Sequence, residues 1–143
     1  MTERFVVFSH GKDSEPWGSK IAAMAEIARE EGFHVESVDY RGIDDPQARV
    51  TRLLAFCKDL RGSLVLVGSS MGGWLSLLVA RHRPERLAGL VLIAAAPDFT
   101  ERMLLKGLSA EDRIALERDG RLERPSQYSP EPSVFTWKRR NFE

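Results

Sequence analysis

The stretch that decides the fold is SLVLVGSSMGGWLSLLVAR, residues 63–81. It opens with an apolar, β-branched run of the length and composition of a buried strand. Its last eight residues, WLSLLVAR, are mostly apolar and indicate a helix that ends near Pro84. A glycine-rich tight turn joins the two. Strand, turn and helix in this order form the repeating unit of domains built on a parallel sheet.

The turn carries the pattern G-x-S-x-G, formed by Gly68, Ser69, Ser70, Met71 and Gly72. Between a strand and a helix, this pattern is typical of a nucleophile elbow, a strained turn that exposes the serine hydroxyl above the sheet. Glycines flank the serine because a Cβ there would collide as strand and helix approach each other. Ser70 is therefore the candidate nucleophile. A purely structural turn and an anion-binding turn are the alternatives, although neither nucleotide-binding fingerprint follows these glycines.

Outward from this stretch, strands and helices alternate up to about Pro97. The expected strands are residues 5–8, 35–38, 63–67 and 90–94. The expected helices cover about residues 17–31, 46–61 and 74–81. Apolar residues recur in them with the helical period, for example at Val50, Leu53 and Cys57. This alternation predicts the α/β class, a doubly wound parallel sheet with right-handed crossovers and the strand order second, first, third, fourth.

Charged residues become frequent after Pro97, and no strand pattern of the earlier kind follows. Residues 100–106 indicate a short helix, and Ser109 with Asp112 forms a capping pattern that opens a second helix over 110–118. We interpret these helices as a lid over an active site; a solvated tail is the alternative. The predicted organisation is a single domain, residues 1–143, with a core of 1–97, a helical lid of 98–124 and an irregular tail of 125–143.

Composition narrows the classes of function. Lys plus Arg and Asp plus Glu number 21 each, so no net charge attracts nucleic acid or an anionic membrane. No apolar run is long enough to span a bilayer, and the first residues do not form a signal-peptide pattern. The single cysteine, Cys57, excludes an internal disulfide and is expected to be a small buried side chain. These features predict a cytoplasmic protein that binds neither nucleic acid nor membranes.

Four segments together resemble the α/β-hydrolase superfamily of serine hydrolases. They are Phe8-Ser9-His10-Gly11 after the first strand, Asp39-Tyr40-Arg41-Gly42 after the second, the elbow itself, and RPERLAGLVLI, residues 83–93. The resemblance covers about residues 4–130. Within the superfamily, residues 96–101 are similar to the branch of small acyl-protein thioesterases and depalmitoylases.

The resemblance implies hydrolysis of a carboxylic ester or thioester, on a small molecule or an acylated protein, through a covalent ester of Ser70. The backbone N–H groups of Met71 and Lys12 would form the oxyanion hole. No cofactor or metal is implied. The residues that would support the elbow and the oxyanion loop are Gly68, Gly72, His10 and Gly11.

The family's triad runs serine, acid, histidine along the chain, and no histidine follows His82 here. The resemblance therefore implies that this chain lacks the catalytic histidine and the acid and has almost no turnover. Asp98 is at most near an alternative position of the acid, and the other interpretation is a cap or loop residue. His10 is expected to be structural, and His34 and His82 to lie at the surface. One alternative function is a non-catalytic remnant that binds or self-associates through the edge of the fourth strand. Another is a module that binds a small anion at the helix after Gly72.

Overall fold

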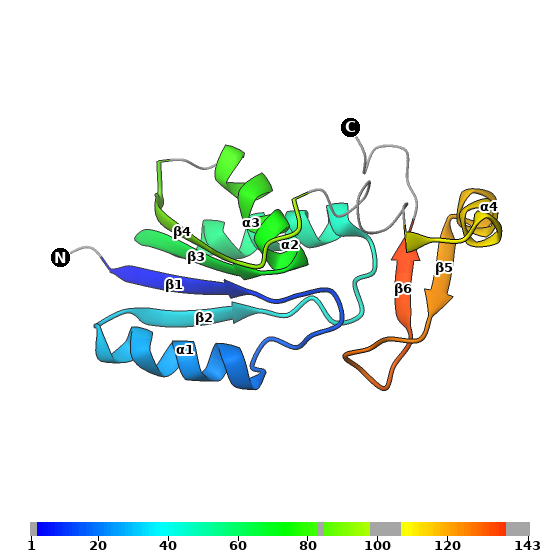
Figure 1. Ribbon diagram of the computed structural model, residues 1–143. Coiled ribbons are helices and arrows are strands. Elements are labelled where there is room, and N and C mark those ends of the chain that lie inside the picture. Colours follow the sequence, from blue (N-terminus) through cyan, green and yellow to red (C-terminus); the bar gives the residue numbers. More distant parts are fainter. Residues whose placement is uncertain (1–2, 83–84, 98–106, 137–143) are drawn as a thin grey trace.

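The computed structural model describes residues 3–82, 85–97 and 107–136, and a four-stranded parallel sheet forms its centre (Figure 1). The strands lie side by side in the order β2-β1-β3-β4. Their bounds are Arg4–Ser9 for β1, His34–Val38 for β2, Ser63–Ser69 for β3 and Leu87–Ile93 for β4. All three neighbouring pairs are parallel. The predicted fold class and strand order are therefore confirmed.

Helices cover both faces of this sheet. α1 (Ser19–Glu30) lies on one face, and α2 (Pro46–Asp59) and α3 (Met71–His82) lie on the other (Figure 1). Each face buries its own apolar cluster. Val6 and Phe8 of β1 belong to the cluster under α1, whereas Val7 belongs to the cluster under α2 and α3. Successive side chains of a strand point to opposite faces, so one continuous apolar run serves both layers.

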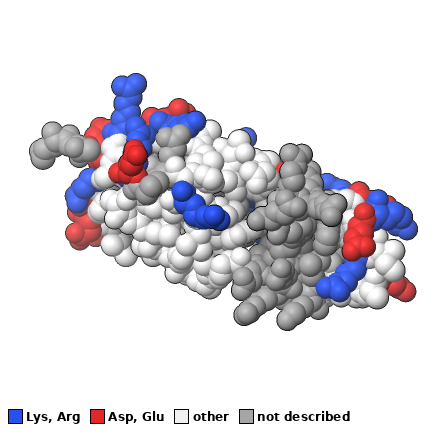
Figure 2. Space-filling model, turned by 90° about the horizontal axis from the view of Figure 1, so that it is seen from above, with Lys and Arg blue, Asp and Glu red and all other residues white. Residues whose placement is uncertain are grey.

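β4 forms one edge of the sheet and is poorly covered. Val91 is 46% exposed and Leu92 is 40% exposed. As neighbours in a strand, these two point to opposite faces, so the described residues leave both faces of this edge partly open. Seen from above, the described middle of the molecule shows mostly uncharged side chains (Figure 2). An apolar strand at an edge is a surface on which a further strand can pair.

The C-terminal part adds a helix and a hairpin. α4 (Ala110–Asp119) begins as predicted, with the Ser109 hydroxyl accepting a hydrogen bond from the backbone N–H of Asp112 at 3.1 Å. Gly120, with φ 70°, ends the helix. β5 (Arg121–Arg124) then pairs antiparallel with β6 (Ser133–Thr136).

This hairpin differs from the sequence expectation, which places β5 in a helical lid and β6 in an irregular tail. Both strands are only four residues long, and the segment between them holds three prolines. Strands this short, separated by such a segment, show no alternating pattern in the sequence. Contact with α4 fixes it instead, since Leu122 and Phe135 pack with Leu116 in a small apolar cluster.

One further expectation is confirmed, and two others cannot be compared with the structure. Cys57 is buried, as expected. Among the described residues, no helix has the length and apolar character needed to cross a membrane. The helix expected at 100–106 and the residue Asp98 lie outside the described residues.

Candidate active site

Ser70 occupies the turn between β3 and α3 and has a φ of 52°, in the left-handed region that residues other than glycine rarely adopt. Backbone hydrogen bonds hold it there. Its N–H donates to the carbonyl of Ile93 at 3.0 Å, and its carbonyl accepts from the N–H of Gly73 at 3.0 Å and of Ala96 at 3.2 Å. The predicted positive φ is thus present, at the carboxyl end of β3. A strained residue fixed by its surroundings at this end of a parallel sheet is characteristic of a functional site.

The flanking glycines allow the turn to pack tightly. A Cβ on Gly72 would overlap the carbonyl oxygen of Ser9 at the end of β1. A Cβ on Gly68 would lie 2.5 Å from the carbonyl oxygen of Gly72, too close for a real contact. Gly11 lies beside the nucleophile, because a Cβ there would be 3.7 Å from that of Ser70. The structure therefore brings the elbow and the loop after β1 together, as the sequence predicts.

His10 is 1% exposed, and both of its ring nitrogens form hydrogen bonds with the backbone. Its Nε2 lies 3.0 Å from the N–H of Tyr40, which can only donate, so Nδ1 carries the proton and donates to the carbonyl of Gly11 at 2.8 Å. Burial lowers the pKa of His10, which outweighs the hydrogen bond with Gly11 that raises it, and the nearby Arg49 lowers it further. A neutral imidazole with both nitrogens engaged is not free to take a proton from Ser70.

The other two histidines lie far from the nucleophile. His34 begins β2, at the amino end of the sheet, whereas Ser70 follows the carboxyl end of β3. His82 ends α3, about 16 Å from the elbow at 1.5 Å per helical residue. None of the chain's 3 histidines is therefore placed as a general base. Among the residues that the structure describes, no group of His, Cys, Asp or Glu is arranged to hold a metal ion.

The two expected oxyanion donors lie next to this turn. Met71 is the first residue of α3, so its N–H is among the donors that a helix start leaves without an intrahelical partner. The Lys12 N–H shares a peptide plane with the carbonyl of Gly11, so the hydrogen bond from His10 to that carbonyl fixes its direction. Both positions suit the role, which stays a prediction.

The side chain of Lys12 ties the oxyanion loop to the hairpin. Its ammonium donates to the hydroxyl of Ser133 at 2.7 Å, lies 3.5 Å from the carboxylate of Asp13, and sits 4.3 Å from the ring centre of Phe135. Ser126 adds a second link by donating to Asp13 at 3.0 Å. Burial lowers the pKa of Lys12, while Asp13 raises it. The hairpin thus covers the loop that supplies a predicted oxyanion donor.

Sequence reasoning missed Arg49, which also reaches this loop. Arg49, Leu53 and Cys57 recur every four residues and are all buried on α2. An arginine in the first position of an apolar stripe is the signal that could have revealed it, because a buried guanidinium needs polar partners.

Comparisons with known proteins agree with the fold. A family model described as "Alpha/beta hydrolase family" matches residues 6–142. The palmitoyl-protein thioesterase ABHD10, mitochondrial, of Rattus norvegicus is 30% identical over 136 residues, which are 88% of this chain and 46% of that protein. A putative hydrolase from Agrobacterium vitis S4 has a solved structure with a TM-score of 0.76 and 29% identity, covering 94% of this chain and 57% of that one. Alpha/beta hydrolase domain-containing protein 10 from mouse gives a TM-score of 0.69 at 27% identity, over 87% of this chain and 53% of that one. The chain spans about half the length of the relatives it matches.

The expectation of a cytoplasmic protein is wrong on this comparison. The relatives from Rattus norvegicus, Mus musculus and Homo sapiens that share this name are all described as mitochondrial. Proteins with balanced charge occur in every compartment. Composition therefore could not identify the location.

Proposed function

Because the chain belongs to the alpha/beta hydrolase family, we propose that it carries the nucleophile and the oxyanion hole of a serine hydrolase for carboxylic esters or thioesters. The observation that carries the proposal is the strained elbow, with Ser70 at φ 52° beside Gly11 and at the start of α3. The name of the rat relative, palmitoyl-protein thioesterase, supports a long-chain acyl thioester as the first substrate to test.

In this reaction the Ser70 oxygen attacks the acyl carbon, and the carbonyl oxygen becomes an oxyanion held by the N–H groups of Met71 and Lys12. The tetrahedral intermediate collapses, and the alcohol or thiol leaves with the proton that the serine gives up. Water then attacks the acyl-enzyme and releases the carboxylic acid and free Ser70. Each oxyanion donor is worth about 3 kcal/mol to the transition state.

None of the three histidines is placed to act as the general base, since His10 is engaged and His34 and His82 lie away from Ser70. Loss of the base lowers turnover by about a millionfold in serine hydrolases. We therefore expect the 143-residue chain by itself to turn over p-nitrophenyl acyl esters hardly at all.

A fluorophosphonate probe tests the nucleophile without requiring turnover. We expect slow labelling at Ser70, located by peptide mass spectrometry, which Ser70→Ala abolishes. Ser69→Ala is the matched control, because it removes the neighbouring hydroxyl and leaves the nucleophile. If the folded chain is not labelled at Ser70, or if Ser70→Ala is labelled as fast as the parent, the assignment is wrong.

A second candidate function rests on the edge of the sheet. Val91 and Leu92 leave β4 apolar and exposed on both faces. A second copy of the chain could pair there along β4 and bury this surface. Sedimentation of the wild type against Leu92→Lys tests it: a dimer that the lysine dissociates supports pairing, and a wild-type monomer at high concentration contradicts it.

A further inference from the structure

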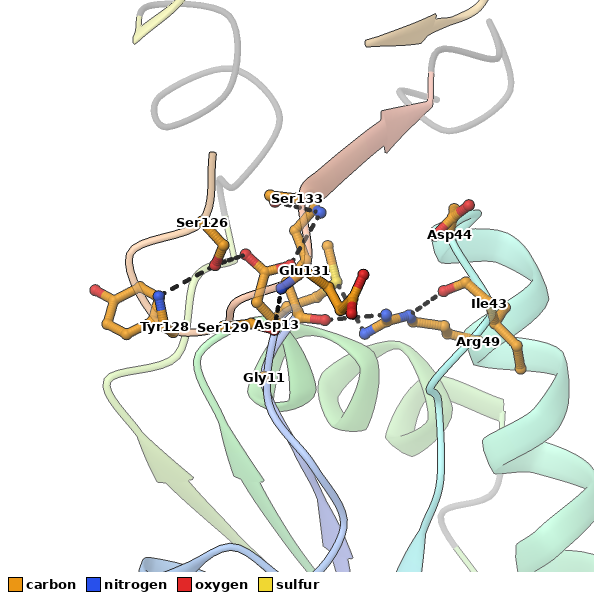
Figure 3. Close-up of polar contacts among 12 residues, drawn as sticks. Gly11, Asp13, Ile43, Asp44, Arg49, Ser126, Tyr128, Ser129, Glu131 and Ser133 are labelled. Atoms are coloured by element: carbon orange, nitrogen blue, oxygen red, sulfur yellow. Dashed lines mark hydrogen bonds and ion pairs between the residues drawn. The ribbon is translucent and has the colours of Figure 1, made fainter. Parts of the chain in front are cut away.

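Arg49 contacts both residues that are expected to donate to the oxyanion. Its Nη2 donates to the carbonyl of Lys12 at 3.1 Å, and its Nη1 lies 3.9 Å from the thioether sulfur of Met71. Its Nε donates to the carbonyl of Ile43 at 2.7 Å, which anchors the guanidinium to the loop before α2 (Figure 3). One side chain therefore joins three segments that are distant in the sequence, next to the elbow.

The surroundings of this guanidinium make its burial costly to the stability of the fold. Arg49 is 5% exposed, and among the described residues its hydrogen-bond partners are two carbonyls and a sulfur, with no carboxylate in ion-pair contact. Tyr40 lies under it, with its ring centre 5.3 Å from the guanidinium carbon. Burial lowers the pKa of Arg49, and Asp44 and Asp13 raise it from a greater distance. A buried charge without a close counterion is costly to the fold, so a role in the site would explain its presence.

The contact with Lys12 acts on the backbone of the oxyanion loop. The carbonyl that Arg49 holds belongs to the peptide between residues 12 and 13, whereas the Lys12 N–H belongs to the peptide before it. His10 fixes that earlier peptide through the carbonyl of Gly11. With both peptide planes held, the backbone dihedrals of Lys12 are set and its N–H has one direction. The contact of Arg49 with Met71 also joins this loop to the start of α3.

We propose that Arg49 is a positioning residue of the oxyanion hole, which holds the Lys12 and Met71 donors in register through its planar fork. The inference rests on the proposed function, since only an acyl-transfer reaction would use the two donors together. Positioning the two donors requires the planar, forked guanidinium and not only its positive charge. Lysine presents a single ammonium, which cannot hold the carbonyls of Lys12 and Ile43 in the same geometry.

The test compares Arg49→Met and Arg49→Lys with Arg52→Met in the full 143-residue chain. Arg52 lies on the same helix and donates to the carbonyl of Asp39 at 3.2 Å, but it is exposed and, within the described part of the chain, forms no hydrogen bond or ion pair with the oxyanion loop. The first readout is the amide resonance and hydrogen exchange of Lys12 and Met71 in ¹⁵N-labelled protein. The second is fluorophosphonate labelling of Ser70, separated into the maximal rate of inactivation and the probe concentration at half that rate.

We expect both Arg49 variants to shift the two amide resonances and to speed their exchange. The maximal rate of inactivation should fall by about tenfold to a hundredfold, the loss typical of a slightly misplaced reacting group. The half-saturating probe concentration should stay within about twofold, because a donor used only in the transition state does not bind the probe beforehand. Arg52→Met should match the parent in every readout.

Wild-type amide resonances and labelling in folded Arg49→Met would overturn the proposal, as would full recovery in Arg49→Lys. Arg49→Lys keeps most of the side-chain volume, so it decides the matter if Arg49→Met fails to fold. If the parent chain is not labelled at Ser70, the proposed nucleophile fails, and the amide readout still decides the role of Arg49. Shifted Lys12 and Met71 resonances would then support the positioning contact, and unchanged ones would refute it.

Discussion

Replacing His10 with alanine is expected to lower the free energy of unfolding by about 3–5 kcal/mol, through one lost hydrogen-bond acceptor and one cavity. The N–H of Tyr40, a residue that is 0% exposed, would lose the Nε2 that accepts its hydrogen bond. An unpaired buried donor costs about 1–3 kcal/mol. Removing a buried ring, which here packs 4.9 Å from that of Tyr40, adds a cavity of comparable cost. The sum is a large part of the roughly 5–15 kcal/mol that stabilises a typical domain.

Urea unfolding followed by circular dichroism measures this loss. His34→Ala is the control, because its side chain is 60% exposed and should change stability by no more than about 0.5 kcal/mol. His10→Gln should recover part of the loss, since its amide oxygen can accept from the Tyr40 N–H. Equal losses in His10→Ala and His34→Ala would refute the structural role of His10.

The same side chain predicts a pH dependence. Burial lowers the pKa of folded His10 below its ordinary value of 6.5, so between these two values the unfolded chain binds more protons than the folded one. The stability contributed by neutral His10 is therefore full above pH 6.5 and is lost as the pH falls through that value, by up to about 1.4 kcal/mol per pH unit. The slope between pH 7 and 5 should be smaller in His10→Gln. An unchanged slope would contradict the burial of a neutral imidazole.

Three further changes test other contacts. Gly72→Ala should prevent folding, because its Cβ would overlap the carbonyl oxygen that ends β1, whereas Gly107→Ala has no atom within 4 Å of its Cβ and should fold normally by circular dichroism. Ser109→Ala should lower the free energy of unfolding by about 1 kcal/mol, because α4 loses its N-cap. An unchanged urea unfolding curve would show that this cap does not stabilise the fold. Lys12→Met should speed amide exchange in β6 by about tenfold or more, because it removes a charged hydrogen bond to Ser133; unaltered exchange would mean that the hairpin docks without it.

Local patterns in the sequence were enough to predict the sheet and its elbow. Short β-branched runs that alternate with helical stripes select parallel strands covered on both faces, and the observed order β2-β1-β3-β4 follows. The two glycines around Ser70 allow only a tight turn, so its positive φ could also be anticipated. Ser109 and Gly120 mark both ends of α4 because helix caps depend on neighbouring residues alone.

The tertiary structure decided the C-terminal hairpin and the side-chain contacts that join distant segments. β5 and β6 carry no periodic signal and pair only because Leu122 and Phe135 find Leu116 on α4. The link from Lys12 to Ser133 spans most of the chain, and no local preference specifies it.

Arg49 shows the same division within one residue. The sequence pattern shows that Arg49 belongs to the stripe of α2. Its partners come from three separate loops and helix ends: they are the carbonyls of Ile43 and Lys12 and the sulfur of Met71. A buried polar group must find partners wherever the packed chain places them, so the sequence by itself determined the elbow and the tertiary structure decided what surrounds it.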